Sequence, residues 1–260
     1  MIAVRERRPD AAARAALARF HDQPLADRLH TRIRWASAPL GPVADALPTE
    51  GRILEIGCGH GLFAAYAALS APRREVLGTD IDAAKVAVAQ RALADLAPRL
   101  RIETAPDGAV PAGPWDGIAI VDMLYLLPPD RQRALLGEAA AALAPDGRLV
   151  VKEMDVRPRW KARWNVLQET ISVRGLRITE GATIQVVDPA LMAEWLAADG
   201  LSTTRTRLDP RTTRARRPAS TSTCHDSGSR TRCAPRSCSW PTSAASLPAA
   251  TRCCAASTST

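Results

Sequence analysis

A glycine-rich turn between an apolar strand and an alanine-rich helix constrains the fold of this chain more than any other feature. Residues 52–56 form a short apolar run that predicts a buried strand, and Gly57, Gly59 and Gly61 follow it directly. Glycine adopts positive φ without penalty and lets a ligand approach the backbone closely. The start of the next helix aims free N–H groups at such a ligand. A ligand-binding βα corner is the favoured interpretation, and a tight corner without a ligand is the alternative.

An acid follows this turn at a distance that also favours a ligand site. Asp80 stands 19 residues after Gly61, at the end of the second expected strand. A carboxylate in that place can accept hydrogen bonds from both hydroxyls of a ribose. The glycine spacing is GxGxG, whereas dinucleotide sites have GxGxxG. A nicotinamide-dependent oxidoreductase therefore stays an alternative that the spacing disfavours.

Apolar strands alternate with helix-like segments from residue 50 to residue 208. The expected strands are 52–56, 75–79, 100–102, 116–121, 148–152 and 201–208. The expected helices are 9–20, 24–36, 61–69, 83–95, 129–143 (ended by the turn at 145–147) and 189–198. This alternation predicts an α/β fold with a Rossmann-like, doubly wound and mostly parallel sheet, preceded by N-terminal helices. Ligands of such sheets bind outside the carboxyl ends of the strands.

The charge of the chain gives little support to a nucleic-acid partner. The 260 residues carry a net charge of +8, but eight Arg and one acid of this balance lie in residues 210–260. Residues 1–209 are therefore nearly neutral, unlike a nucleic-acid-binding domain. No apolar run of about 18 residues could span a membrane, and the first residues lack the apolar core of a secretory signal. We expect a cytoplasmic protein without a membrane span.

The last 51 residues differ in composition from the rest. They hold 19 Ser or Thr and five of the six Cys, and Leu247 is their only aliphatic residue larger than Ala. Such a segment buries too little apolar surface to offset its chain entropy, so we expect disorder. The spacing of its Cys residues matches neither a zinc site nor a disulfide framework, and no metal is expected.

Two hypotheses account for this change of composition near Asp209. The chain uses 32 Arg against three Lys, as a GC-rich coding sequence would. Read out of frame, such DNA yields Arg, Ala, Pro, Ser, Thr and Cys. A frameshift and a genuine disordered tail both fit, and the other reading frames of the coding DNA would separate them.

The glycine turn and its neighbours resemble a known family. Residues 55–61 read ExGxGxG, and together with Asp80, the segment 116–122 and the strand at Arg148 they are similar to class I S-adenosylmethionine-dependent methyltransferases. The resemblance covers about residues 50–155. It implies S-adenosylmethionine as the cofactor, a methyltransferase domain at 50–209 and a helical cap at 1–49, with the tail at 210–260.

The resemblance also implies a set of cofactor-binding residues. These are Glu55, Gly57, Gly59, Gly61, Asp80, Ile81, Asp107, Asp122 and Met123. The glycines would line the methionine part, Asp80 would bind the ribose and Ile81 would pack on the adenine. Asp107 would accept from the adenine amino group, and Asp122 with Met123 would border the cofactor and the acceptor. For Asp122 a plain helix cap is the alternative.

The family ordinarily ends with an antiparallel strand inserted beside the fifth strand. Nothing after Leu208 has the apolar composition of such a strand. We therefore expect the final antiparallel strand to be missing or replaced by the disordered tail, which also supports the frameshift hypothesis.

Methyl transfer is an in-line displacement, so the protein mainly aligns the reactants, and it supplies a base only for some acceptors. Lys152 and Glu153 leave the fifth strand at the ligand edge and are candidates for acceptor contact, with a mutual ion pair as the alternative. His30, beside Arg34 and Trp35 in a helix that could form a lid, is a weak candidate for a base. Cys58 and His60, within the turn, are interpreted as a packing and a surface residue.

A second aromatic group lies between the fifth strand and the last helix. Trp160, Trp164 and Gln168 share one helix face, and four basic residues lie among them. An anionic or carrier-bound acceptor fits this pattern, while docking of the helix on the core is the alternative.

The sequence therefore predicts a methyltransferase that acts on a small or medium-sized acceptor. An NAD(P)-binding oxidoreductase and an inactive chain damaged at its C-terminus are the alternatives. The oligomeric state, the acceptor and the methylated atom are not predicted.

Overall fold

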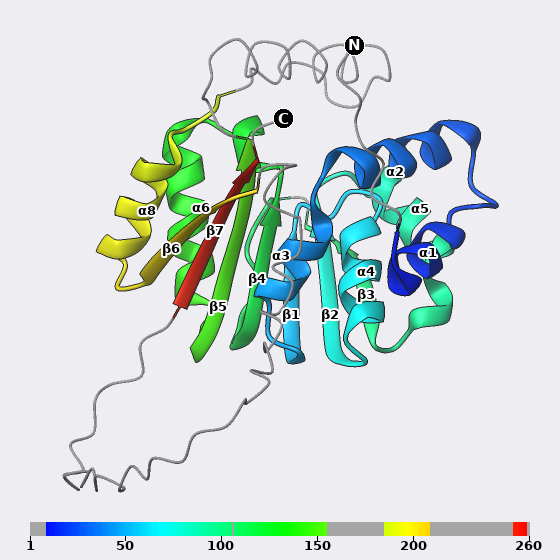
Figure 1. Ribbon diagram of the computed structural model, residues 1–260, viewed down its shortest axis with the longest axis horizontal. Helices are drawn as coiled ribbons and strands as arrows, with labels where there is room; N and C mark the ends of the chain where they lie inside the picture. The colour runs from blue at the N-terminus through cyan, green and yellow to red at the C-terminus, as the bar shows by residue number, and fades with distance from the viewer. Residues whose placement is uncertain (1–8, 106, 155–184, 209–251, 259–260) are drawn as a thin grey trace, which may run out of the picture.

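Seven parallel strands form one sheet in the computed structural model, which describes residues 9–105, 107–154, 185–208 and 252–258 (Figure 1). The strands are β1 (Glu50–Ile56), β2 (Arg73–Asp80), β3 (Leu100–Thr104), β4 (Trp115–Val121), β5 (Leu143–Met154), β6 (Ser202–Arg207) and β7 (Arg252–Thr258). Their order is β3-β2-β1-β4-β5-β7-β6, and every pairing is parallel. All carboxyl ends therefore lie at one edge of the sheet.

Helices cover both faces of the sheet, as the doubly wound prediction requires. One core lies against α1 (Ala11–Ala18), α3 (Leu40–Ala46), α4 (Leu62–Ser70) and α5 (Ala83–Ala92). The other lies against α6 (Pro129–Ala141) and α8 (Pro189–Ala198). Neighbouring residues of a strand point to opposite faces, so Ile53 belongs to the first core and Leu54 to the second. The Rossmann-like α/β prediction is confirmed.

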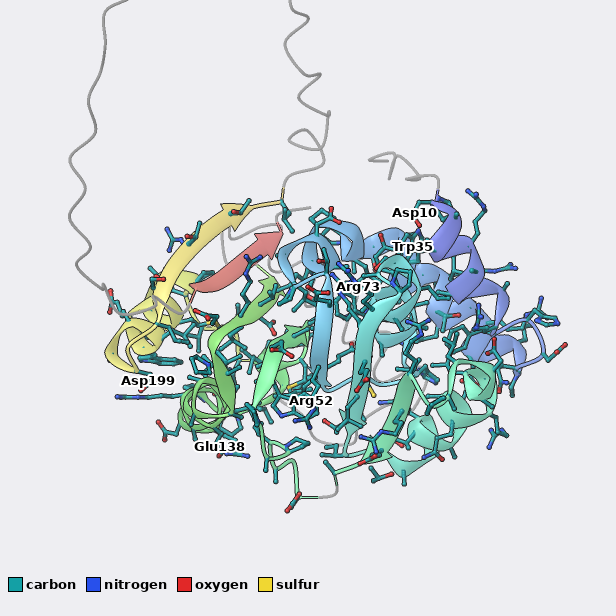
Figure 2. The ribbon with its side chains drawn as sticks, turned by 90° about the horizontal axis from the view of Figure 1, so that it is seen from below. Asp10, Trp35, Arg52, Arg73, Glu138 and Asp199 are labelled. Atoms are coloured by element: carbon teal, nitrogen blue, oxygen red, sulfur yellow. The ribbon has the colours of Figure 1, made fainter. Side chains whose placement is uncertain are left out.

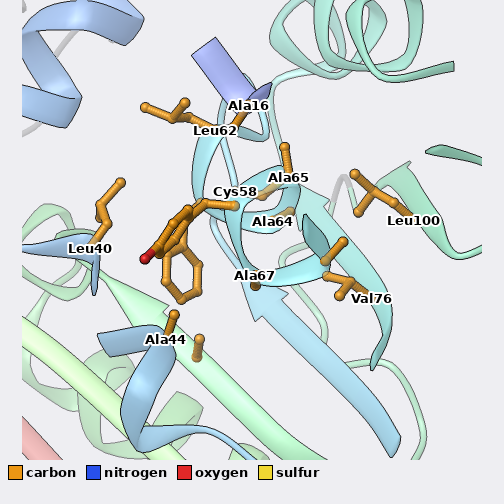
Figure 3. Packing of buried hydrophobic residues seen from close by; sticks show 14 of the residues in the cluster. Ala16, Leu40, Ala44, Cys58, Leu62, Ala64, Ala65, Ala67, Val76 and Leu100 are labelled. Carbon is orange, nitrogen blue, oxygen red and sulfur yellow. The ribbon is translucent and has the colours of Figure 1, made fainter. Parts of the chain in front are cut away.

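Small side chains let α4 lie close to the sheet. Ala64, Ala65, Ala67 and Ala68 are fully buried, and Figure 3 shows three of them beside Cys58 and Val76. Cys58 is a free and buried cysteine. Burial raises the pKa of its thiol well above the usual value. The thiol is therefore a packing group, as expected, and not a nucleophile.

The N-terminal helices are anchored on α4 through one aromatic side chain. The Tyr66 hydroxyl donates to Asp10 Oδ2 at 3.0 Å, and the tyrosine ring meets Trp35 edge-on at 5.1 Å. Asp10 caps α1, and Trp35 belongs to α2 (Leu25–Ser37), so both helices are fixed (Figure 2). The short helix α3 was not predicted. It is too short for a periodic pattern to identify it.

The start of β5 differs from the prediction. Residues 145–147 were expected to be a turn, yet β5 already begins at Leu143. Trp115 pairs with Leu143 and Gly117 pairs with Arg148, so the extra residues of β5 form a bulge. Proline and glycine are tolerated within a strand at such an irregularity.

A strand after Leu208 is the second correction. Arg252–Thr258 forms β7, which lies between β5 and β6 and is parallel to both. Main-chain groups make these pairings, so the absence of large apolar residues does not prevent them. The antiparallel strand of the predicted family does not occur among the described residues. Its place in the sheet is taken by a parallel strand.

Within the described ranges, no helix combines the length and the apolar character that crossing a membrane requires.

Candidate active site

The glycine-rich turn joins β1 to α4 in the conformation that its sequence predicts. Gly57, Gly59 and Gly61 all have positive φ, at 75°, 54° and 76°. The carbonyl of Thr79 at the end of β2 accepts from the N–H groups of Gly57 and Cys58, at 2.8 and 2.9 Å. These bonds hold the turn against the neighbouring strand.

The three glycines are needed for different reasons. A Cβ on Gly57 would come within 2.6 Å of Met123 Cγ, and one on Gly61 within 2.8 Å of Leu93 Cδ1. These two positions allow close packing. A Cβ on Gly59 would meet nothing within 4 Å. Gly59 therefore presents its backbone to open space at the carboxyl edge.

Asp80 braces this turn from the end of β2. Its Oδ2 accepts from the N–H of Gly59 at 2.7 Å, and its Oδ1 accepts from the N–H of Asp82 at 2.9 Å. The next side chain, Ile81, is 62% exposed although it is a large hydrophobic residue. A polar and an apolar group thus stand side by side at the rim of the turn.

The loop that carries Asp107 approaches this rim. Asp107 is exposed, and its Oδ1 accepts from the N–H of Ala109 at 3.1 Å. A Cβ on Gly108 would lie 3.7 Å from Ile81 Cγ2, which brings the loop beside Ile81. Two of the predicted residues, far apart in the chain, therefore lie close together.

Glu55 is a buried carboxyl beneath the turn. Burial raises its pKa from 4.5 to about 8, against the lowering effects of Arg34 and of the N–H of Ala64. Its Oε2 has no hydrogen-bond partner among the described residues. At neutral pH this carboxyl is therefore largely protonated.

Asp122, at the end of β4, lies in a buried cluster of charges. The Lys152 ammonium contacts Asp122 Oδ1, and Arg34 Nη1 lies 2.9 Å from Asp122 Oδ2. Burial alone would raise the pKa of Asp122, but the two cations outweigh it and the pKa lies below its ordinary value. The backbone of Asp122 has φ of 50°, in the left-handed region that few non-glycine residues adopt. The cluster therefore fixes both the charge and the conformation of the strand end.

Glu153 does not pair with Lys152, so the predicted mutual ion pair was wrong. Consecutive residues of a strand point to opposite faces, and Lys152 finds Asp122 instead. Glu153 Oε1 accepts from the N–H groups of Met123 and Leu124, at 3.0 and 2.8 Å. Burial, followed by the charge of Asp122, raises the pKa of Glu153 to about 8. Glu153 thus holds the turn that follows β4.

Two histidines meet above the glycine turn. The rings of His30 and His60 are 4.9 Å apart, and His60 Nε2 lies 3.2 Å from Asp27 Oδ1. Burial lowers the pKa of both histidines, that of His30 to about 4. His60, with its side chain only 9% exposed, is not the surface residue that was expected.

Sequence reasoning missed the part that Asp27 plays here. Asp27, His30 and Arg34 lie on one face of α2 because they are spaced by three and four residues. That spacing was the available signal. Trp160, Trp164 and Gln168, which formed the other predicted acceptor group, lie outside the described residues.

A cavity of about 560 Å³ lies at the opposite edge of the sheet. Its lining includes Arg52, which is labelled in Figure 2. The Arg52 guanidinium stacks 4.5 Å over the ring of Trp115. These residues belong to the amino-terminal ends of β1 and β4. Ligands of open α/β sheets bind at the other ends, so we assign the site to the carboxyl edge.

The chain belongs to a family of methyltransferase domains, whose sequence profile matches residues 25–206. Its resemblance to class I methyltransferases is thereby confirmed. No curated protein sequence matches the chain.

Solved structures share the fold. An O-methyltransferase family protein from Burkholderia thailandensis is 17% identical, with 71% of this chain and 57% of that chain covered and a TM-score of 0.55. Mitomycin 7-O-methyltransferase is 21% identical, with 71% and 54% covered and a TM-score of 0.53. A cyclopropane synthase from Mycobacterium tuberculosis is 18% identical, with 72% and 66% covered and a TM-score of 0.51. The chain spans little more than half the length of the first two.

Proposed function

We propose that the chain transfers a methyl group from S-adenosylmethionine, bound at the carboxyl ends of β1 and β2. The observation that carries this proposal is the open space at Gly59, whose N–H is held by the acid at the end of β2. Positive φ alone would explain a glycine at position 59, but here the strand-end carboxylate of Asp80 and the exposed Ile81 lie at the same turn.

The residues at this edge fit the nucleoside part of the cofactor. A carboxylate has about four lone-pair positions, and two N–H groups occupy only two of those of Asp80. The remainder can accept from the ribose hydroxyls. Ile81 offers an exposed apolar surface to the adenine, and Asp107 lies in the adjacent loop, from which it would accept from the adenine amino group.

The methionine part would lie along the glycines, toward Met123. Bound there, the cofactor supplies an electrophilic methyl group on a sulfonium. Glu55 lies beneath these glycines with a buried oxygen that has no partner among the described residues. We assign it to the positive groups of the cofactor, because a cation nearby favours the ionised carboxylate.

The acceptor would approach over the ends of β4 and β5 and be a small or medium-sized molecule. Lys152 and Glu153 are positioning residues in this proposal, since each already holds the strand ends in place. His30 is the residue left to accept a proton from a hydroxyl acceptor, because its imidazole is neutral at physiological pH. Small acceptors of this kind are compatible with a cytoplasmic location.

Calorimetric titration of the full chain with S-adenosylhomocysteine, and separately with NADH, tests the cofactor. We expect affinity on the order of micromolar for the first and no binding of the second. Binding of NADH alone would establish the oxidoreductase alternative. A thermal melt of the same sample is the control, since a chain without a cooperative transition would support the hypothesis of a damaged C-terminus.

A further inference from the structure

The outer face of α2 carries an apolar stripe. Leu25, Leu29 and Ile33 are 75%, 55% and 56% exposed, and they are three of the five exposed large hydrophobic residues in the described ranges. Their spacing of four residues places them in one row along the helix. Single exposed aliphatic residues are ordinary, but a continuous row of three on one helix indicates a docking surface.

The orientation of α2 is fixed by contacts on its inner face. Asp27 pairs with His60, Arg34 pairs with Asp122, and Trp35 meets Tyr66. These contacts join α2 to three separate parts of the fold. The helix therefore cannot rotate to bury the stripe without breaking them.

The charge beside the stripe has a single sign. Arg28 and Arg32 follow Leu25 and Leu29 by three residues, about one helical turn, so they lie beside the stripe. Asp27 is the only acid of α2, and it faces His60 on the inner side of the helix. The outer face thus combines aliphatic side chains with cations and contains no acid. A helix of this kind lies in the interface of a membrane with anionic lipids.

We propose that α2 docks this protein on an anionic phospholipid surface, with Leu25, Leu29 and Ile33 in the interface and Arg28 and Arg32 at the headgroups. A second copy of the chain fits less well. Antiparallel two-fold packing of the stripe on itself would place Arg28 and Arg32 of both copies along the same side, where like charges repel.

Docking of the outer face of α2 on a lipid surface would not cover the candidate active site, which lies on the inner side of this helix. The residues that reach the site, His30 and Arg34, project from the opposite side of the same helix. Figure 1 shows α2 beside the carboxyl edge of the sheet. The lipid surface would then lie one helix diameter from the candidate site, about 10 Å away. The inference needs no methyl transfer, because docking is measured without cofactor or acceptor.

Co-sedimentation with lipid vesicles tests the proposal on the full chain. The probes are vesicles of phosphatidylcholine alone and vesicles with about one-third phosphatidylglycerol. We expect binding only to the anionic vesicles, and we expect it to weaken as salt is added. Absence of binding to anionic vesicles at low salt would overturn the proposal.

Two sets of variants separate the stripe from its charges. Replacing Leu25, Leu29 and Ile33 by Ser should weaken binding at least about tenfold, because the apolar area that enters the interface is lost. Arg28→Gln with Arg32→Gln should weaken it roughly 30-fold at low salt. Leu191→Ser removes another exposed aliphatic residue, on α8, and should leave binding unchanged.

A thermal melt shows whether each variant is folded. If the triple Ser variant does not fold, the single variant Leu29→Ser replaces it in the vesicle-binding test. Binding that survives both sets of substitutions would contradict the assignment to α2. Sedimentation equilibrium gives the remaining outcome: a dimer that Leu29→Ser dissociates would assign the stripe to a second copy and overturn the proposal.

Discussion

At the carboxyl ends of β1 and β2 the site consists mainly of backbone, whereas at the ends of β4 and β5 it consists of buried charge. The first half depends on glycines at positive φ and on one carboxylate that accepts from Gly59 and Asp82. The second half depends on Asp122, which is held between a lysine of β5 and an arginine of α2.

The two halves therefore differ in what stabilises them. A glycine turn needs only local backbone geometry and costs little when its ligand is absent. A buried ion cluster depends on all its members at once, because removal of one leaves the others charged and unsolvated. Substitution of Gly59, which has free space around it, should therefore affect mainly binding, and substitution in the second half mainly stability.

The largest expected effect is on stability, at Lys152. Lys152→Met leaves the buried Asp122 with Arg34 as its one remaining cation in the cluster. We expect the free energy of unfolding to fall by about 3–5 kcal/mol. Urea denaturation with an unchanged m value would measure this loss.

Two controls sharpen that result. Lys85→Met removes the partly exposed pair with Asp82 and should cost no more than about 1 kcal/mol. Adding Asp122→Asn to Lys152→Met should recover part of the loss, because the fully buried carboxylate is then gone and the Arg34 side chain, which is 27% exposed, keeps some contact with solvent. If Lys152→Met costs no more than Lys85→Met, the ends of β4 and β5 are not built on buried charge.

A smaller effect is expected from Glu55, a buried carboxyl in the first half of the site, at the ends of β1 and β2 (the backbone half). Its pKa is raised from 4.5 to about 8, so the folded protein binds this proton more tightly than the unfolded chain does. The free energy of unfolding should therefore fall as the pH rises from about 5 to about 8. Glu55→Gln should reduce that fall by about 1 kcal/mol or more.

Unfolding by urea at several pH values measures this slope. Glu50→Gln, at the exposed start of the same strand, is the matched control and should leave the slope unchanged. If the free energy of unfolding changes equally with pH in the unsubstituted protein and in Glu55→Gln, the titrating group is not Glu55.

The smallest effect is expected at the opposite edge of the sheet. Arg52→Ala removes a guanidinium that stacks on Trp115 and donates to the carbonyl of Pro114 at 3.1 Å. The cost in stability should be about 0.5–1 kcal/mol, with cofactor affinity unchanged. A loss of cofactor affinity in this variant would mean that the binding site was assigned to the wrong edge.

The backbone half of the site could be predicted from the sequence because its signals are local. Glycine spacing and a strand-end acid identify Gly59 and Asp80 without knowledge of the rest of the fold. The charged half, at the ends of β4 and β5, could be predicted less completely, because Arg34, Asp122 and Lys152 come from three distant segments. The pairing of β4 with β5 brings Lys152 beside Asp122, and the packing of α2 over the strand ends adds Arg34.

The same distinction explains the errors in the fold. The alternation of strands and helices was predicted because periodicity reports local structure. The strand Arg252–Thr258 was missed because its place in the sheet depends on main-chain pairing with β5 and β6. The amino-acid composition of a segment does not predict such pairing. The surface assignment of His60 failed for a related reason, since α2 covers it from elsewhere in the chain.

The most direct test of the central claim compares two glycine substitutions. Gly59 and Gly200 both have positive φ and free space around the missing Cβ, so an alanine strains the backbone similarly at each. We predict that Gly59→Ala weakens the binding of S-adenosylhomocysteine at least about tenfold, while Gly200→Ala leaves the affinity unchanged at a similar cost of about 1 kcal/mol in stability. Equal affinities in the two variants would contradict the assignment of the cofactor to the glycine turn.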